Sequence, residues 1–248
     1  DGIAGLMKKY KVDVIEGEAK LLPNSQVEIN GETHEATDIL LCTGSSPAIP
    51  PIPGVDLDHV VDSTGILERE TLPNHLVVVG GGVIGCEFAC MYASVGIQVT
   101  VLEAMAEICP NLDAEVSETL REGLSKKGVA FKLGAKVESI SSDKVSYSDE
   151  SGSNELEADL VLVATGRRPN TKNLGLEELG LDIDDRGGVR VDDRGATNIP
   201  GLWAAGDVTG QAWLAHAASR MAEVVVNNIT GRKDQMRYDS MPAVVYTS

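Results

Sequence analysis

Three glycines and one acid are the residues of this sequence whose types and spacing point most clearly to ligand binding. Gly80, Gly82 and Gly85 follow the apolar run Leu76–Val79, and Glu103 closes a second apolar run 23 residues after Gly80. In this arrangement the first glycine permits a tight turn, the second lets a diphosphate approach the backbone, and the third lets a helix pack against the strand. The spacing therefore predicts a dinucleotide-binding loop.

The helix expected after these glycines would complete an anion site, because its first turn offers unpaired backbone N–H groups and a positive dipole end. Glu103 would accept hydrogen bonds from a ribose 2′-hydroxyl and repel a 2′-phosphate, and no Arg occurs at 103–109. We therefore expect NAD(H) rather than NADP(H). The alternative is a glycine-rich turn in an α/β domain that binds no nucleotide. The predicted loop consists of Gly80, Gly81, Gly82, Val83, Ile84, Gly85 and Cys86.

The composition and net charge limit the classes of partner that the chain can be expected to bind. The 248 residues allow one or two domains with a sizeable core, and their net charge of −17 argues against nucleic acid or an anionic membrane surface as a partner. No run approaches the ~20 apolar residues of a membrane helix, and no signal peptide is visible. The four cysteines form no zinc-type pair, so no metal site is predicted, and they suggest a reducing compartment, the cytoplasm.

Two segments of the chain echo each other. Residues 36–50 and 158–170 each contain an Asp, an apolar strand, Thr-Gly, two further residues and a Pro. Gly80 stands 86 residues before Gly166 of the second copy, and the same offset from Gly44 of the first copy falls before the first residue. We therefore expect the chain to begin inside a domain whose opening strand, glycine turn and helix precede it.

The periodicity of apolar residues predicts an α/β fold with a parallel sheet. Asp113 is placed to cap a helix, and Gly128 follows the expected end of that helix. Helices are expected at 1–10, 83–95, 113–127 and 215–228, strands at 12–15, 76–79, 98–102, 129–133, 160–164, 181–183, 189–191, 202–205 and 241–246, and hairpins at 26–37 and 144–158.

Four segments in order carry a family resemblance: VVVGGGVIGCEFA, ATGRRPNTKNLGLEELGL, IPGLWAAGDVTGQAWLAHAA and the terminal MPAVVYTS. Together they resemble the flavoprotein disulfide reductases that bind two dinucleotides. The stretch KNLGLEELGL, with Glu103, is most similar to the dihydrolipoyl dehydrogenases within that group. The resemblance implies a Rossmann-like NAD-binding domain inserted in a partial FAD-binding domain.

The resemblance also implies which residues hold the two cofactors. Asp207 matches an acid that binds the ribityl chain of FAD, and Ala19 matches a small residue near its adenine. The FAD site would comprise Ala19, Thr43, Gly44, Ser45, Asp207, Trp213, Leu214, Ala215 and His216. The NAD site would comprise Glu103 and the glycine loop together with Glu87, Val137 and Gly166. Glu87 would lie near nicotinamide and flavin, and Val137 beside the NAD adenine.

The domains implied are a first part of the FAD-binding domain at 1–71, the NAD-binding domain at 72–170, the return part of the FAD-binding domain at 171–238, and the start of an interface domain at 239–248. The family's redox disulfide, a CxxxxC motif, and its His–Glu base do not occur in these residues. No catalytic residue is therefore predicted in this chain.

The activity implied is transfer of electrons from protein-bound dihydrolipoamide, through a redox disulfide and FAD, to NAD⁺. The implied partners are the lipoyl domain of a 2-oxoacid dehydrogenase or glycine cleavage complex and, in the full-length protein, a second copy of the same chain. Three alternatives remain within the family: another disulfide reductase, an NADH oxidase or a transhydrogenase. A fourth is a nucleotide-binding module without turnover.

Overall fold

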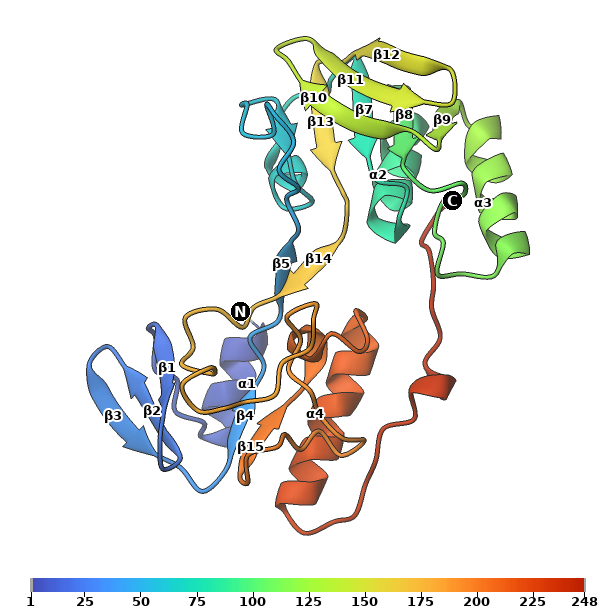
Figure 1. The fold of residues 1–248 in the computed structure, drawn as a ribbon. Helices are drawn as coiled ribbons and strands as arrows, with labels where there is room; N and C mark the ends of the chain where they lie inside the picture. Colours follow the sequence, from blue (N-terminus) through green and yellow to red (C-terminus); the bar gives the residue numbers. More distant parts are fainter. Residues whose placement is uncertain (1, 248) are drawn as a thin grey trace. The chain divides into compact units, whose positions relative to one another are not determined.

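The structure, a computed structural model, describes residues 2–247 and divides them into two compact units. The first unit contains the chain up to Ser45 together with Arg168–Pro242, and the second contains Ser46–Arg167 together with the residues from Ala243 on. The ribbon is coloured along the sequence in Figure 1. Asp1 and Ser248, at which the first and last of the expected domains begin and end, lie outside the described residues.

The second unit is built on a parallel sheet of five strands in the order β6-β13-β7-β8-β9. The crossover from β7 to β8 is the helix α2, and the crossover from β8 to β9 is α3, as expected for βαβ units. The bounds are β6 Val60–Val61, β7 His75–Val79, α2 Val83–Ser94, β8 Gln98–Glu103, α3 Ala114–Lys126, β9 Val129–Leu133 and β13 Leu160–Val163, with a 3-10 turn at Gly65–Glu68.

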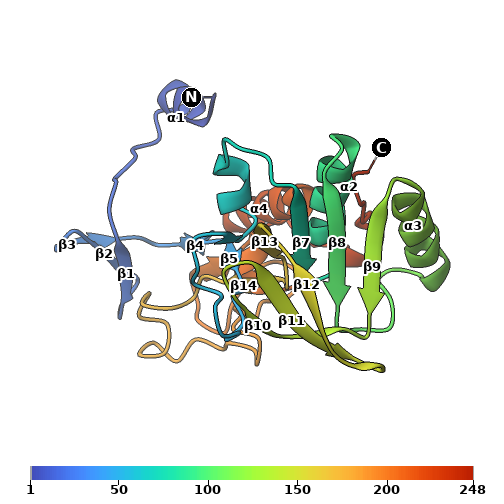
Figure 2. The ribbon, with the colours of Figure 1, turned by 90° about the horizontal axis from the view of Figure 1, so that it is seen from above.

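Alternate residues of each central strand face opposite cores, because the side-chain period of a strand is two. Leu76 and Val78 pack with α2 and α3, whereas Val77 and Val79 pack with a three-stranded antiparallel sheet. The helices and that second sheet thus lie on opposite faces of the parallel sheet (Figures 1 and 2). The second sheet comprises β10 Lys136–Ile140, β11 Lys144–Asp149 and β12 Gly152–Glu157.

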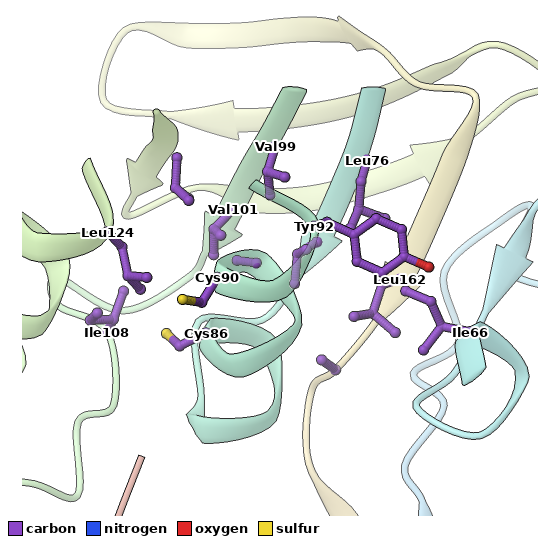
Figure 3. Close-up of a cluster of buried hydrophobic side chains, with 14 of the residues drawn as sticks. Ile66, Leu76, Cys86, Cys90, Tyr92, Val99, Val101, Ile108, Leu124 and Leu162 are labelled. Carbon is purple, nitrogen blue, oxygen red and sulfur yellow. The ribbon is translucent and has the colours of Figure 1, made fainter. Parts of the chain in front are cut away.

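Helix α2 fits its face of the sheet through small residues. Cys86, Ala89 and Cys90 are buried at helical spacing and let the helix lie close to the strands. Figure 3 shows Cys86, Cys90 and Tyr92 of α2 pointing into one cluster with side chains of β7, β8 and β13. Each fully buried aliphatic side chain in such a cluster contributes roughly 1.5–3 kcal/mol to stability.

Helix α3 begins as the sequence predicts. Asp113 caps it by accepting a hydrogen bond from the backbone N–H of Glu115 at 3.0 Å, and Gly128 follows with φ +93°. A left-handed glycine is the usual way to end a helix because it carries no Cβ penalty. The predicted strands and helices between residues 76 and 164 are confirmed to within about two residues, the ordinary uncertainty of element ends.

The first unit combines an antiparallel meander, a parallel strand pair and one long packed helix. The hairpin between the second and third strands turns at Asn30-Gly31, both with positive φ, as a type I′ turn requires. The bounds are α1 Gly2–Tyr10, β1 Ala19–Leu22, β2 Gln26–Ile29, β3 Glu32–Glu35, β4 Ile39–Leu41, β15 Leu202–Ala204 and α4 Ala215–Ile229, with 3-10 turns at Gly206–Thr209 and Tyr238–Ser240. The chain passes between the units in β5 (Ser45–Pro47) and returns in β14 (Arg167–Pro169).

Four strand predictions are wrong. Residues 12–15 and 241–246 form no strand, and 181–183 and 189–191 share only the isolated bridge between Ile183 and Val189. A strand needs a neighbour that pairs with its backbone. Val14 is 66% exposed, and within the described residues its segment lies beside no such neighbour. No helix of the described chain is both long and apolar enough to cross a membrane.

Candidate functional site

The glycine loop lies between β7 and α2, where the spacing of the glycines places it. Gly80 has φ +108°, and a Cβ there would lie 2.6 Å from the carbonyl oxygen of Ala164. A Cβ on Gly85 would collide with the carbonyl oxygen of Gly80. These two positions therefore accept only glycine, one for the turn and one for the close approach of helix to strand.

Open space lies in front of the loop at Gly82. A Cβ built there would meet nothing within 4 Å, although Gly82 is the residue that caps α2. Gly82 has no side chain that could cap the twelve-residue helix, and the first turn of α2 contains no acid. The first backbone N–H groups of a helix have no partner within the helix. An anion can therefore approach the loop at Gly82 and Val83.

Glu103 holds the loop from beneath. Its side chain is buried at the end of β8; Oε2 accepts from the backbone N–H of Gly81 at 2.6 Å, and Oε1 accepts from that of Met105 at 2.7 Å. Each carboxylate oxygen has a second lone pair, so the same group can also accept from a ribose hydroxyl. The sequence predicts a role in ribose binding, which stays a prediction, and it does not reveal the bond to Gly81, because the spacing cannot show a bond between side chain and loop backbone.

The remaining residues of the predicted NAD set belong to the same unit. Glu87 is half-buried on α2 and accepts a hydrogen bond from the backbone N–H of Tyr246 at 2.8 Å. Val137 is half-buried on β10. The side chain of Cys86 is fully buried and faces the core, which leaves its backbone as the part that a dinucleotide could contact.

The last residue of the predicted NAD set, Gly166, lies in a Thr-Gly turn. Gly166 has φ +124°, and its carbonyl oxygen accepts from the backbone N–H of Ala48 at 2.9 Å. The hydroxyl of Thr165 donates to the carbonyl oxygen of Ala48 at 2.9 Å. A Cβ on Gly80 would lie 3.2 Å from the Cα of Thr165, so this turn and the glycine loop lie against each other.

The predicted FAD residues gather in the first unit, at the carboxyl ends of β4 and β15. The hydroxyl of Ser45 donates to Oδ2 of Asp207 at 2.6 Å. The hydroxyl of Thr43 donates to the carbonyl oxygen of Asn170 at 2.7 Å, and the Asn170 side-chain amide donates to the carbonyl oxygen of Thr43 at 2.9 Å. Asn170 was not predicted as a site residue, although it ends the repeated segment that the sequence reveals. Gly44 adopts φ +68° between them.

The other predicted FAD residues lie on two further elements. Trp213, Leu214, Ala215 and His216 lead into α4, whose cap residue Leu214 makes no side-chain capping bond. Nε2 of His216 lies 3.0 Å from the carbonyl oxygen of Pro242. Ala19 is exposed at the start of β1, in a different sheet from β4 and β15.

One cavity of the structure lies apart from these residues. A cavity of about 670 Å³ lies beside α3 and is walled by residues such as Val116, Leu120 and Val245. None of the predicted cofactor residues lines it. Among the residues that the structure describes, no three His, Cys, Asp or Glu side chains gather as metal ligands would.

Comparison with known proteins shows the family of the chain. Residues 1–222 match the pyridine nucleotide-disulphide oxidoreductase family. A protein of Pseudomonas putida named dihydrolipoyl dehydrogenase 3 is 42% identical over 99% of this chain and 55% of its own length. A dihydrolipoyl dehydrogenase of Chlamydia muridarum is 39% identical over 100% of this chain and 54% of its own length. The chain thus spans about half the length of the curated relatives it matches.

Solved structures give the same result. The LpdA protein of Mycobacterium tuberculosis superposes with a TM-score of 0.90 at 29% identity, covering 99% of this chain and 56% of that one. The HOCl-induced flavoprotein disulfide reductase RclA of Escherichia coli superposes with a TM-score of 0.85 at 32% identity, covering 98% of this chain and 57% of that one. By its sequence match and its fold, the chain belongs to the pyridine nucleotide-disulphide oxidoreductase family.

Proposed function

We propose that the chain carries two dinucleotide sites, one in each unit. The NAD site occupies the second unit, where the diphosphate lies at Gly82 and Val83 and the adenosine ribose at Glu103. One observation carries this proposal: the end of α2 is open at Gly82, which makes no side-chain capping bond, and the glycine loop before it is held in shape by the bond from Gly81 to Glu103. The expected NAD-binding domain at 72–170 then falls mainly within this unit.

The acid at the end of β8 favours NAD(H) over NADP(H). A buried carboxylate already bonded to two backbone N–H groups stays in place to accept from a ribose hydroxyl. A 2′-phosphate at the same position would face a like charge, and the sequence from 103 to 109 offers no Arg to pair with it.

The proposed FAD site lies in the first unit, among those residues of the expected domain parts 1–71 and 171–238 that belong to this unit. Asp207 and Ser45 form a hydroxyl-binding pair suited to a ribityl chain, because the carboxylate accepts and the serine both donates and accepts. The turn at Thr43 and Gly44 and the start of α4 from Trp213 to His216 supply backbone groups, and Ala19 leaves room near an adenine. When bound, the flavin supplies the transfer of electrons between a disulfide and NAD⁺.

For the whole protein we propose dihydrolipoyl dehydrogenase activity, in which protein-bound dihydrolipoamide is oxidised and NAD⁺ is reduced. The relatives bearing that name support this proposal. The proposed partners are a lipoyl domain of a 2-oxoacid dehydrogenase or glycine cleavage complex and a second copy of the protein, in the cytoplasm. Residues 239–248 are proposed to begin the interface domain.

A second candidate is another disulfide reductase of the same family. The structural neighbour named a flavoprotein disulfide reductase supports this alternative. An NADH oxidase or a transhydrogenase would use the same two sites. A nucleotide-binding module without turnover also fits the 248 residues, which contain neither a CxxxxC motif nor the His–Glu base of the family.

Two measurements on the purified chain test the proposal. Its visible absorption spectrum is expected to show a flavin band when FAD is supplied, and NADH is expected to bind without lipoamide-dependent reduction of NAD⁺. The full-length protein, assayed in parallel, is expected to reduce NAD⁺ with dihydrolipoamide. A full-length protein that turns over another disulfide but not lipoamide would favour the second candidate, and failure of the chain to bind NADH would refute the NAD site.

A further inference from the structure

Two thiols lie directly beneath the glycine loop. Cys86 belongs to the first turn of α2, and Cys109 to the loop that joins β8 to α3. The thiols of Cys86 and Cys109 both donate to the carbonyl oxygen of Gly81, at 3.4 and 3.6 Å. The two side chains are 0% and 3% exposed, so they share one buried space against the backbone of the loop. The proposed electron transfer uses neither thiol.

The two thiols also interact with each other. A hydrogen bond from Cys86 lowers the pKa of Cys109 and raises the pKa of Cys86, while burial and the carboxylate of Glu103 oppose ionisation of both. When Cys109 ionises, the Cys86 S–H turns from the Gly81 carbonyl to the thiolate. Cys109 is thus the nucleophilic member of the pair, because the thiolate is the reactive form of cysteine.

The backbone around Cys109 is strained and closely tied to the loop. Cys109 has φ +44°, in the left-handed region that a cysteine adopts only at a cost. Its backbone N–H donates to the carbonyl oxygen of Gly81 at 2.9 Å, and its own carbonyl accepts from the hydroxyl of Ser117 at 3.2 Å. A Cβ on Gly81 would lie 3.0 Å from Cγ2 of Ile108. Residues 108 and 109 therefore form the wall against which the glycine loop rests.

We propose that Cys86 and Cys109 are a modification site, a thiol pair that hydrogen peroxide or an organic hydroperoxide closes to a disulfide. Transient opening of the connecting loop 104–113 admits the oxidant. The Cys109 thiolate attacks one oxygen of the O–O bond and becomes a sulfenic acid as hydroxide or alkoxide leaves, which takes up the proton released by the Cys109 thiol to give water or an alcohol. The Cys86 sulfur then attacks the Cys109 sulfur, the S–S bond forms, and the sulfenic oxygen leaves as water with the Cys86 proton. Two thiols lose two electrons, which the peroxide gains.

Closure of this pair changes the glycine loop. The S–S bond is shorter than the contact it replaces, and it removes both S–H donors from the Gly81 carbonyl. Because Ile108 is already in close contact with Gly81, movement of the Cys109 segment displaces the loop. This consequence rests on the proposed NAD site. NADH is expected to bind about tenfold more weakly to the oxidised chain, the effect of losing one charge-assisted hydrogen bond to the diphosphate.

A matched control lies one turn further along the same helix. Cys90 is also buried, and Figure 3 shows it on the same side of α2 as Cys86. The two thiol donors to the loop carbonyl of Gly81 come from Cys86 and Cys109. Cys90→Ala removes a buried sulfur of equal size and leaves the proposed pair complete.

The first experiment maps the bond. The whole chain is treated with hydrogen peroxide, alkylated in denaturant and analysed by peptide mass spectrometry. A peptide linking Cys86 to Cys109, lighter by two hydrogen atoms, is expected in the wild type and in Cys90→Ala, and is expected to be absent in Cys86→Ala and Cys109→Ala. Circular dichroism confirms that each variant is folded. Recovery of all four cysteines in alkylated form from the peroxide-treated wild type after denaturation, or a link to Cys90 or Cys42 instead, would overturn the proposal.

The second experiment measures NADH affinity before oxidation, after it, and after reduction with dithiothreitol. We expect the oxidised chain to bind NADH about tenfold more weakly than the reduced chain, and dithiothreitol to restore the original affinity. The affinity of Cys109→Ala is expected not to change on oxidation. A linked chain whose affinity does not change would overturn the coupling to the loop. A reduced chain that binds no NADH would refute the proposed NAD site, while the peptide map would still decide whether the thiol pair closes.

Discussion

The two units contain the same Thr-Gly turn with different neighbours. In the first unit the hydroxyl of Thr43 donates to the carbonyl of Asn170, and in the second the hydroxyl of Thr165 donates to the carbonyl of Ala48. In each case the glycine that follows accepts the backbone N–H of that same partner at 2.9 Å. The repeat seen in the sequence is therefore also a repeat of hydrogen bonds.

The elements beside the two turns differ. In the second unit Gly80 lies against the turn, and the neighbouring helix presents free N–H groups. In the first unit a carboxylate occupies the comparable edge, with Asp207 bonded to Ser45. One turn thus borders the proposed backbone site for an anion, and the other borders the proposed side-chain site for hydroxyl groups. A shared scaffold can serve two ligand chemistries by changing what lies next to it.

The largest effect is expected from Gly85→Val in the second unit. The added side chain would collide with the carbonyl of Gly80, so the helix must move from the strand at a cost of about 3 kcal/mol, and NADH binding should be lost. Gly123→Val, at a glycine on α3 with no atom near its Cβ position, is the control. Thermal unfolding and NADH titration give the readouts. Unchanged NADH affinity in a folded Gly85→Val chain would refute the role of the glycine.

Glu103→Ala is expected to weaken NADH binding by on the order of 30-fold, or ~2 kcal/mol, because it removes both the ribose acceptor and the bond that shapes the loop. The preference for NADH over NADPH should fall with it. Glu103→Arg should also bind NADH more weakly. It should bind NADPH more tightly only if the glycine loop keeps its conformation without the bond from Gly81 to Glu103. Glu118→Ala, an exposed acid on α3, is the control. Fluorescence titrations with both coenzymes measure the change, and an unaltered preference would contradict the assignment.

Asp207→Asn tests the first unit, with a smaller expected effect. The neutral amide weakens the bond from Ser45 and the acceptance of ligand hydroxyls, so FAD retention should fall by about fivefold, or ~1 kcal/mol. NADH affinity should not change. Asp193→Asn, an exposed acid in the same unit, is the matched control. Bound flavin is measured by absorbance after gel filtration, and equal flavin content in both variants would count against the proposed FAD site.

The smallest expected effect is a pH dependence in the second unit. Burial acts to raise the pKa of Asp159, but N–H donors from Asn74 and His75 outweigh it and lower the pKa below its ordinary value. A carboxyl with a lowered pKa stabilises the fold above its unfolded pKa of about 3.9, and this contribution is lost as pH falls through the folded value. The side chain is exposed, so solvent screening limits the effect to about a few tenths of a kcal/mol.

Asp159→Asn should therefore remove a small part of the stability at neutral pH and flatten its fall toward about pH 3. Denaturant unfolding at several pH values gives the comparison, with Glu138→Gln as the control at another exposed acid of the same unit. If the variant and the wild type lose stability in parallel on acidification, this carboxylate makes no measurable contribution.

Local features of the fold could be predicted from the sequence. The glycine spacing located β7 and α2, and Asp113 located the start of α3, because turns and caps depend on residues within a few positions of one another. The failed strands show the limit of periodicity. Val14 and Val245 fit an apolar pattern, yet one is exposed and the other packs beside the α2 cluster without forming a strand. Periodicity indicates which residues favour burial but not which element covers them.

The proposed sites remain predictions. Residue types and spacing point to Glu103 and the family resemblance points to Asp207, whereas the hydrogen bonds that shape the two regions join positions far apart in the chain. Glu103 reaches Gly81 across 22 residues, and Thr43 reaches Asn170 across 127. Such pairs depend on the packing of whole elements, which a single sequence does not reveal. The thiol pair of Cys86 and Cys109 was missed for the same reason, since neither spacing nor motif links the two.

Calorimetric titration of the whole chain with NADH, followed by NADPH in a matched cell, compares the two coenzymes at the glycine loop. One NADH is expected to bind per chain, and NADPH is expected to bind at least about tenfold more weakly because its 2′-phosphate faces Glu103. Equal affinity for the two coenzymes, or no heat with NADH, would contradict a site formed by the end of α2 and the acid of β8.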